Sequence, residues 1–429
     1  MDTIQEKRLD EQGLKLHFIQ TKKFKTINII VKLKSKLDKE TITKRALLPY
    51  ILKQGTKTYP DRSALQLKLD DLYGAVLTAD GGKKGENHII SVRLEFANEK
   101  FIPDASNVMD EAVQLLSEVL FHPNTGATGF DDAVFKREVG TLKQKISAIQ
   151  DDKMSYANMR LIDEMCKEEA YQLHVHGYEE DLNNLTNDDL FNYYQHMLEQ
   201  DEMDIYVLGD FVEEKVKHLI MDTMQRTEQQ GTKEADPAAK NSVIEQNEII
   251  EKQKVQQAKL HIGFRTNTTY QDEAYFALQV FNGLFGGFPS SKLFINVREK
   301  NSLAYYASSR LESHKGLLFV FSGIAPDDFE KARDIIRLQV QAMKDGDFTE
   351  QELNETKDLI VNQLKETMDH PQGLIEILYQ QVIGNRQMTP AELLEGIQNV
   401  TKDEVVHVAS KIEEDTVYLL TSEGGEQGE

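Results

Sequence analysis

The sequence predicts an α+β protein of two homologous domains, each with a mostly antiparallel sheet and helices packed on one face. The stretches "HIISVRLEF" (88–96) and "GLLFVFSGI" (316–324) both have strand patterns, and an amphipathic helix follows each one. Similarly, "LTNDDLFNYYQHMLEQDEMDIYVLGD" (185–210) parallels "VTKDEVVHVASKIEEDTVYLLTSE" (400–423), since both open with a helix cap and close in a β-branched strand. A repeat distance of more than ~200 residues indicates a duplicated domain rather than a solenoid.

Composition is that of a globular protein without membrane segments. The chain has 429 residues, 40% of them apolar and 28% charged, which gives room for two or three domains. No apolar run approaches the ~18 residues that cross a bilayer, so we expect no membrane association. The start, "MDTIQEKRLDEQG", lacks the apolar stretch of a signal peptide, and Cys166 is the single cysteine. Together these observations predict a reducing, cytoplasmic location.

The net charge is strongly negative. There are 50 basic and 72 acidic residues, which give a formal charge of −22. This balance repels phosphate backbones, so we expect no nucleic-acid partner. An acidic cavity would attract basic peptides, but a solvated acidic surface explains the same charge and is the interpretation we favour.

A polar segment separates the two halves. Residues 227–257 contain Gly-Thr and Asp-Pro signals and few large apolar side chains. The sequence therefore predicts an N-terminal domain over 1–228, a linker over 229–248 and a C-terminal domain over 249–429.

The first chemically informative stretch is "TKRALLPYILKQGTKTYPDRSALQLKLDDLYGAVLTAD" (43–80). It predicts an amphipathic helix that stops at Gly-Thr, followed by a second helix. It contains no histidine and no glutamate, and the whole chain lacks an H-E-x-x-H or H-x-x-E-H motif, a P-loop and a G-x-S-x-G elbow. Local motifs for common catalytic chemistries are thus absent.

Two histidines stand close together, His174 and His176 in "YQLHVHGYEED". On a strand they would face the same side, and a metal site would then need acids from elsewhere. We favour the other interpretation, two loop histidines with ordinary hydrogen bonds.

The richest stretch is "FNGLFGGFPSSKLFINVREKNSLAYYAS" (281–308). We expect a helix that ends in a turn at Gly286–Gly287 with positive φ, and a new helix that starts near the capping pair Ser290–Ser291. Arg298 and Tyr305 follow, seven residues apart, with the tyrosine on a strand. The residues alone favour an ordinary helix–loop–strand connection with a surface arginine and a half-buried tyrosine.

This stretch resembles the second-half signature of the pitrilysin and mitochondrial processing peptidase family. The glycines, the serine pair, Leu293–Phe294, Arg298–Lys300 and Leu303–Tyr305 occur in the family's order. The resemblance covers nearly the whole chain, including the duplication, the linker and "GYEEDLNNLTNDDLFNYY" (177–194). It implies two homologous domains that face each other as a clam, with peptide substrates enclosed in a chamber.

The resemblance also implies where zinc would bind. Catalytic members carry His-x-x-Glu-His, then Gly-Thr four residues later; alignment on Gly-Thr places Ala46, Pro49 and Tyr50 at the three motif positions. A third ligand, a glutamate seven residues after another acid, aligns with Lys145, which follows Glu138. Zinc catalysis needs three protein ligands, a bound water and a nearby carboxylate base. Since these side chains cannot provide them, we expect a degenerate site with no metal and no other cofactor.

The second-half residues retain a possible role. In the family, the equivalents of Arg298 and Tyr305 contact the substrate backbone or the developing oxyanion, so these two could support catalysis in a partner chain. The glycine-rich turn, with Gly286, Gly287, Ser290 and Ser291, resembles a substrate-handling loop.

Three functions remain open. The first is a non-catalytic, substrate-binding subunit of a two-chain peptidase, a dimer with a zinc-containing homologous subunit. The second is a structural or peptide-binding pseudoenzyme without any proteolytic role. The third, an active peptidase with an unorthodox metal site, is the least favoured.

Overall fold

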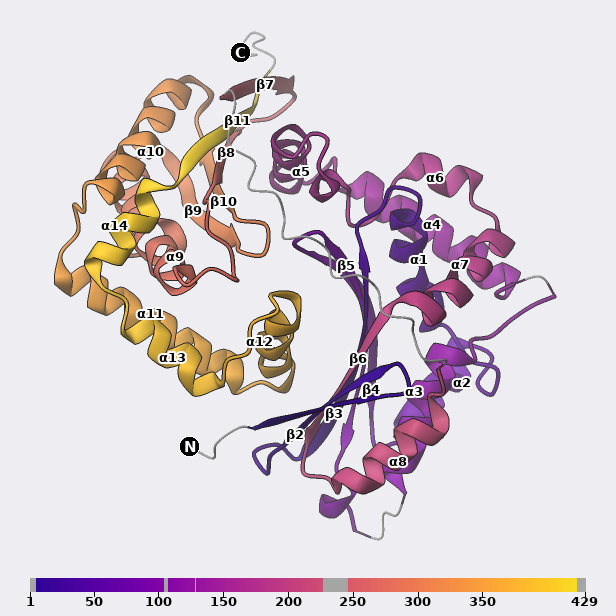
Figure 1. The fold of residues 1–429 in the computed structure, drawn as a ribbon. Coiled ribbons are helices and arrows are strands. Elements are labelled where there is room, and N and C mark those ends of the chain that lie inside the picture. Colours follow the sequence, from indigo (N-terminus) through magenta and orange to yellow (C-terminus); the bar gives the residue numbers. More distant parts are fainter. Residues whose placement is uncertain (1–4, 104–106, 128, 227–245, 423–429) are drawn as a thin grey trace. The chain divides into compact units, whose positions relative to one another are not determined.

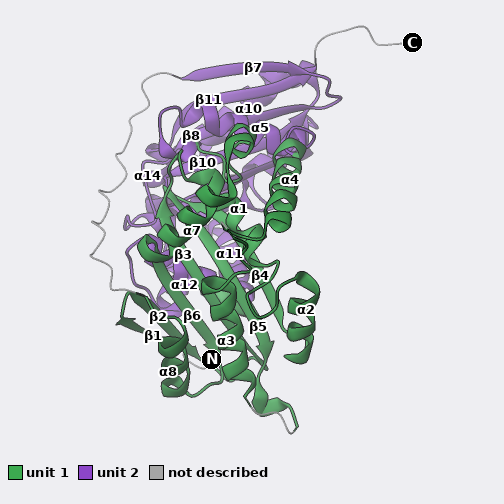
Figure 2. Ribbon diagram, turned by 90° about the vertical axis from the view of Figure 1, so that its right-hand side faces the viewer, with its two compact units in different colours: residues 1–148, 173–235, 371–375 green, residues 149–172, 236–370, 376–429 purple. Residues whose placement is uncertain are grey.

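The computed structural model describes residues 5–103, 107–127, 129–226 and 246–422. These residues form two compact units, coloured separately in Figure 2. Unit 1 comprises residues 1–148, 173–235 and 371–375, and unit 2 comprises 149–172, 236–370 and 376–429. The predicted linker, 229–248, lies almost entirely outside the described residues; its last two residues begin strand β7 (Asn247–Gln253).

Unit 1 is built on a six-stranded sheet with the order β1-β2-β6-β3-β5-β4 (Figure 1). Its strands are β1 (Glu6–Glu11), β2 (Leu14–Gln20), β3 (Thr26–Lys36), β4 (Val76–Lys84), β5 (Asn87–Ala97) and β6 (Glu202–Gly209). Its helices are α1 (Ile42–Leu52), α2 (Arg62–Asp71), η1 (Glu99–Phe101), α3 (Val108–Phe121), α4 (Asp132–Ala148), α6 (Glu179–Asn184), α7 (Asn187–Gln200) and α8 (Glu213–Thr223). The pair β2–β6 is parallel and the other pairs are antiparallel.

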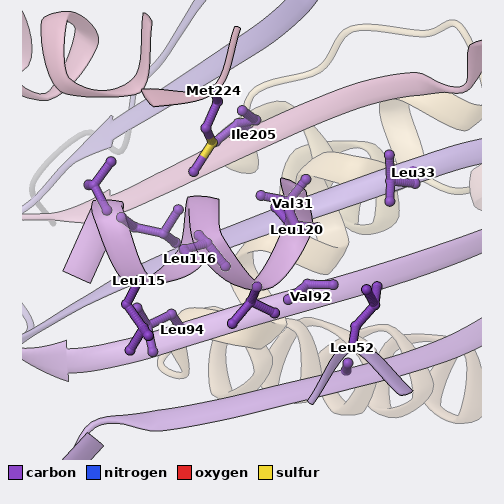
Figure 3. Packing of buried hydrophobic residues seen from close by; sticks show 14 of the residues in the cluster. Val31, Leu33, Leu52, Val92, Leu94, Leu115, Leu116, Leu120, Ile205 and Met224 are labelled. Atoms are coloured by element: carbon purple, nitrogen blue, oxygen red, sulfur yellow. The ribbon is translucent and has the colours of Figure 1, made fainter. Parts of the chain in front are cut away.

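The core of unit 1 lies between one face of this sheet and its helices. Alternate residues of β3, such as Val31 and Leu33, point into the core because successive side chains on a strand face opposite sides. Figure 3 shows Leu116 and Leu120 of α3 among these strand side chains. The predicted helical spacing of this segment is therefore the spacing of its buried face.

Unit 2 is built on a five-stranded sheet with the order β7-β11-β8-β10-β9. Its further strands are β8 (Ala258–Arg265), β9 (Ala304–Glu312), β10 (Leu317–Ile324) and β11 (Glu413–Ser422). Its helices and helical turns are α5 (Lys153–Met165), η2 (Ala170–Gln172), α9 (Tyr275–Asn282), η3 (Gly283–Gly287), η4 (Phe294–Glu299), η5 (Pro326–Asp328), α10 (Phe329–Lys344), α11 (Glu350–Met368), α12 (Pro371–Ile383, of which 371–375 belong to unit 1), α13 (Pro390–Gln398) and α14 (Lys402–Ser410).

The two sheets have the same plan. The order β2-β6-β3-β5-β4 in unit 1 corresponds to β7-β11-β8-β10-β9 in unit 2. In each series the first pair is parallel and the remaining pairs are antiparallel. The predicted α+β class, with two like domains and mostly antiparallel sheets, is confirmed.

Helix α5 occupies a position that local sequence patterns do not indicate. It packs on the face of β8 opposite to the core of unit 2, where a side chain at Gly263 would overlap Met165. Arg265, on the same face, donates from Nη2 to the Met165 carbonyl and to a Glu169 oxygen, both at 2.7 Å. The sheet of unit 2 thus has helices on both faces, and α5 belongs to unit 2 although it precedes the linker.

Within the described ranges, no helix combines the length and the apolar character that crossing a membrane requires.

Candidate functional site

Helix α1 carries three of the four positions that align with the family's zinc site. Ala46 and Tyr50 are four residues apart, so they share one face of the helix. Ala46 is buried in the core of unit 1, whereas Tyr50 is partly exposed. From the neighbouring helix α4, the Lys145 ammonium lies 5.7 Å from the centre of the Tyr50 ring. The structure therefore brings Tyr50 and Lys145 together.

The side chains at these positions do not fit a zinc ion. A structural or catalytic zinc is held by imidazole, thiolate or carboxylate donors, and Ala46 has no donor atom. Pro49 is buried in α1 and offers no carboxylate to act as a base. Lys145 holds a positive charge over Tyr50, where a cation would be repelled. In the part of the chain that the structure describes, no group of three His, Cys, Asp or Glu residues could hold a metal.

Glu138, the upstream acid of the aligned glutamate pair, is engaged elsewhere. It is buried on α4, and its Oε1 accepts from Arg137 Nε at 2.8 Å. Arg137 Nη2 also donates to Gln54 Oε1 at 3.0 Å, just past the end of α1. These contacts tie α4 to α1 without a metal.

A buried arginine fixes the other side of α1. Arg45 has no exposed surface, and its Nη1 donates to Asp201 Oδ2 at 2.6 Å. Its Nη2 donates to the carbonyls of Leu33 and His88, and its Nε donates to His88 Nδ1 at 3.1 Å. Burial, and then the charge of Arg45, lower the pKa of His88 to about 3, so this imidazole is neutral and can accept the Nε proton. Arg45 therefore anchors α1 to β3, β5 and the start of β6.

The histidine pair lies in a loop beside this helix, as the favoured interpretation predicts, but the ordinary hydrogen bonds that it also predicts are absent at the His176 ring among the described residues. Gly177 has a φ of +69°, and a side chain there would overlap Thr43 at the start of α1. Thr43 Oγ1 accepts from the Tyr178 backbone N–H at 3.1 Å, which holds the loop against α1. The His174 ring stacks on Tyr178 with 4.8 Å between centroids. Sequence spacing gave no reason to link this loop to the aligned zinc positions.

The charge of Lys145 acts on His176. Burial, and then the charges of Lys145 and His174, lower the pKa of His176 to about 4. His176 is only partly buried, and its ring makes no hydrogen bond to the described residues. The Lys145 charge thus acts both on the Tyr50 ring and on His176. The sequence signal for this loop was the family resemblance that includes residues 177–194.

Strand β4 borders the same region. It is the last strand in the order of its sheet, and α1 packs against it. Lys83, near its end, donates from Nζ to the Leu173 carbonyl at 2.8 Å, which joins the strand to the histidine loop. A terminal strand offers backbone N–H and C=O groups to a further strand. The region therefore combines a sheet edge with a group of cations.

Arg298 and Tyr305 lie in unit 2. The Arg298 guanidinium stacks on the Phe294 ring at 4.6 Å and lies 3.8 Å from Glu299. Tyr305 is at a bulge of β9, because Tyr306 and Ala304 pair with successive residues of β10 and leave it unpaired. Its residue surface is 72% exposed, so the residue-based expectation of a half-buried tyrosine is wrong. The bulge turns the ring outward.

The glycine-rich turn differs from the expectation. Gly286 and Gly287 lie in η3, a π-helical turn that continues α9, and neither has positive φ. Gly286 is needed for a different reason, since a Cβ atom there would lie 2.5 Å from Ser309 Oγ and 2.7 Å from Leu293 Cδ1. The expected capping serine is present: Ser291 Oγ accepts from the Phe294 backbone N–H at 3.5 Å. Ser290 is exposed.

Known proteins resemble the chain, and one of them does so over its full length. The family model described as "Peptidase M16 inactive domain" matches residues 184–360. "Probable inactive metalloprotease YmfF" of Bacillus subtilis is 45% identical over 99% of this chain and 100% of its own length. "Uncharacterized zinc protease YmxG" of the same species is 24% identical over 61% of this chain and 63% of its own length.

Solved structures resemble the chain over nearly its whole length. A conserved protein from Enterococcus faecalis V583 is 33% identical, with a TM-score of 0.89 over 98% of this chain and 100% of that one. A protease from Helicobacter pylori, at 16% identity, shares the fold, with a TM-score of 0.80 over 98% of this chain and 100% of that one. With 45% identity across its full length to an inactive-type relative, the chain belongs to the M16, or pitrilysin, family as an inactive metalloprotease homologue.

Proposed function

We propose that this chain is the non-catalytic, peptide-binding subunit of a two-chain peptidase whose zinc is carried by a homologous subunit. The observation that carries the proposal is the pairing of Lys145 with Tyr50 beside the edge strand β4. The side chains that would bind zinc are missing at this position, while the edge strand β4 remains suited to binding an extended peptide.

Strand β4 supplies the peptide-binding surface in this proposal. A peptide can add to a sheet edge through main-chain hydrogen bonds, and pockets for alternate side chains then give specificity. Ala79 of β4 is buried and its neighbours Thr78 and Asp80 are not, so one face of the strand is free of the core. A peptide bound here would pass the aligned zinc positions on α1.

In this proposal, Arg298 and Tyr305 assist catalysis by the zinc-containing partner chain. The exposed phenol of Tyr305 and the partly exposed guanidinium of Arg298 are hydrogen-bond donors that suit a developing oxyanion. Gly286, Gly287, Ser290 and Ser291 would form a neighbouring substrate-handling segment, with Gly287 and Ser290 the exposed members.

The partner in this proposal is a zinc-type relative from the same organism. Bacillus subtilis provides a precedent, because it has both a relative named as an inactive metalloprotease and a relative named as a zinc protease, and both resemble this chain. The proposal further places the heterodimer in the cytoplasm.

A second candidate is a structural or peptide-binding pseudoenzyme. It is favoured by the surroundings of Arg298, whose guanidinium already has the Phe294 ring and the Glu299 carboxylate as neighbours. An arginine engaged in this way has a role in the local structure without any substrate.

Reconstitution distinguishes the two. The purified chain and the zinc-type relative encoded in the same genome would be mixed, then analysed by size-exclusion chromatography and with quenched fluorescent peptides. We expect the chain alone to hold no stoichiometric zinc and to cleave nothing, and the mixture to co-elute and cleave faster than the relative alone. A partner without its general-base glutamate is the control. No co-elution and no gain in cleavage would leave the pseudoenzyme as the better account.

A further inference from the structure

We propose that the lysine at the lost ligand position anchors a carboxylate subsite, which binds an acidic side chain of an extended peptide next to β4. The inference deepens the proposed peptide-binding function and rests on it. The inferred ligand is negatively charged, although the chain that binds it has a formal net charge of −22.

Lys145 is available for such a ligand. It is exposed on α4, and its ammonium lies over the Tyr50 ring at 5.7 Å. Among the described residues it forms no ion pair with a carboxylate. The ring holds the ammonium in place by a cation–π contact and leaves its hydrogen-bond donors unused. A carboxylate is the ligand that such an ammonium prefers.

His176 adds a second donor on the same side. Its ring makes no hydrogen bond within the described residues, and it lies close enough to Lys145 for the lysine charge to disfavour a second positive charge. A neutral imidazole still offers one N–H donor. A bound carboxylate would accept from both groups, and its negative charge would offset the charge of Lys145.

Two acidic side chains on the helices beside the subsite, Glu138 and Asp181, are already paired. Glu138 of α4 accepts from Arg137, and Asp181 of α6 accepts from Thr43 Oγ1 at 2.5 Å and lies 3.6 Å from Lys39 Nζ. Neither of these two carboxylates pairs with Lys145, so they leave its ammonium available to a ligand. The negative charge elsewhere on the chain acts weakly here, because charges beyond about 8 Å are screened at physiological salt.

A hydrogen bond connects strand β4 to the loop beside the subsite. Lys83 of β4 donates to the Leu173 carbonyl, at the start of the loop that carries His176. A peptide added to β4 would therefore run toward this loop, and one of its side chains would come within reach of Lys145. A carboxylate takes the place that the family gives to the metal, and the fixed ammonium keeps a positive charge there.

Four pools of fluorescein-labelled decapeptides test the inference on the full chain. Three pools share a strand-forming composition and an amidated C-terminus, with Glu, Gln or Lys at alternate positions; the fourth is the Gln pool with a free C-terminal carboxylate. Fluorescence anisotropy at physiological salt measures their affinities. We expect the Glu pool to bind about three- to fivefold more tightly than the Gln pool, the range that a partly solvated ion pair contributes.

Lys145→Gln should abolish this preference, and Lys145→Arg should retain it. Lys136→Gln is the matched control, since Lys136 is exposed on the same helix and the change in net charge is the same. If the free-carboxylate Gln pool gains affinity in a Lys145-dependent way, the subsite also accepts a peptide C-terminus, which supports a carboxylate anchor.

Two results overturn the inference. Equal affinity for the Glu and Gln pools, or a Glu preference that survives in Lys145→Gln, removes the carboxylate anchor while peptide binding stands. Absence of binding to every pool contradicts both the anchor and the peptide-binding function proposed above.

Discussion

Arg45 and Asp201 form an ion pair inside unit 1, with 2.6 Å between Arg45 Nη1 and Asp201 Oδ2. Arg45 has no exposed surface, and Asp201 is 5% exposed. The arginine directly precedes Ala46, the first of the aligned zinc positions. A buried ion pair thus anchors the helix that carries the aligned zinc positions.

Arg45→Met should destabilise unit 1 strongly. The thioether fills part of the same space, but the variant leaves the Asp201 carboxylate buried without its partner, which costs about 3–5 kcal/mol. Denaturant unfolding followed by fluorescence or circular dichroism would measure the change. Arg62→Met on α2 is the control, because Arg62 is exposed and its loss should cost less than about 0.5 kcal/mol.

Removal of both charges should recover stability. Arg45→Met combined with Asp201→Leu leaves no unpaired carboxylate, so the double variant should be more stable than Arg45→Met alone. A single variant within about 0.5 kcal/mol of the natural chain would show that the pair does not anchor α1.

Lys145→Gln should raise the pKa of His176 above its value of about 4. Burial is the larger cause of the lowered pKa and stays in place, so the new value should remain below that of an exposed histidine. The sign follows because the lysine charge disfavours the protonated imidazole, and its removal makes protonation easier. Imidazole NMR signals recorded against pH would measure the shift, with Lys136→Gln as the control. An unchanged titration would mean that the two groups do not face each other.

Tyr305→Phe should reduce the turnover of the reconstituted pair at least tenfold while assembly stays intact. The substitution keeps the ring and deletes only the hydroxyl; in other enzymes the loss of one oxyanion donor costs about 10²–10³ in turnover. Peptide cleavage and size-exclusion chromatography of the mixture would report the two properties separately.

Tyr306→Phe is the matched control for this variant. Tyr306 packs against Gly323, and its buried hydroxyl has no hydrogen-bond partner among the described residues, so its loss should leave turnover unchanged. Equal turnover of Tyr305→Phe and the natural chain in a correctly assembled pair would reject the catalytic-support role.

Limited proteolysis should cut the chain between Thr227 and Gln246, where the sequence is polar and contains the Gly-Thr and Asp-Pro signals. The two fragments should then co-elute under native conditions. The N-terminal fragment contains α5, whose Tyr156 hydroxyl donates to Glu251 at 2.7 Å and whose neighbour Glu169 accepts from Arg265. Both contacts lie within unit 2.

Separation of the nicked fragments without denaturant would contradict the packing of α5 on the sheet of unit 2. Cuts confined to other places would count against the predicted boundary itself.

Local pattern made much of the fold predictable. The alternation in 88–96 and 316–324, and the helical spacing that follows each, depend only on which side chains must be buried, and the structure has β5, β10, α3 and α10 there. The loss of metal ligands was also predictable from the sequence, because zinc requires particular side chains. No fold can turn Ala46 or Lys145 into such a ligand.

Tertiary structure decided which surfaces meet. Leu161 and Met165 make α5 amphipathic in the sequence, but no local pattern tells which of two similar sheets a helix will cover. Only packing placed α5 in unit 2. For the same reason, the sequence could not show that His176 lies beside Lys145, since that contact depends on how the loop folds against α1.

Gly286 shows why a sequence pattern and the tertiary structure can give different reasons for the same residue. The glycine suits a position where a side chain is excluded, and from the sequence we predicted that the reason was a left-handed turn. The structure gives helical backbone and a close contact with Ser309 and Leu293 instead. The sequence by itself determined which side chains the chain offers and the periodicity of its elements. The contacts between distant segments set the basic surroundings of Tyr50 and the outward turn of Tyr305, because each depends on neighbours that are far away along the chain.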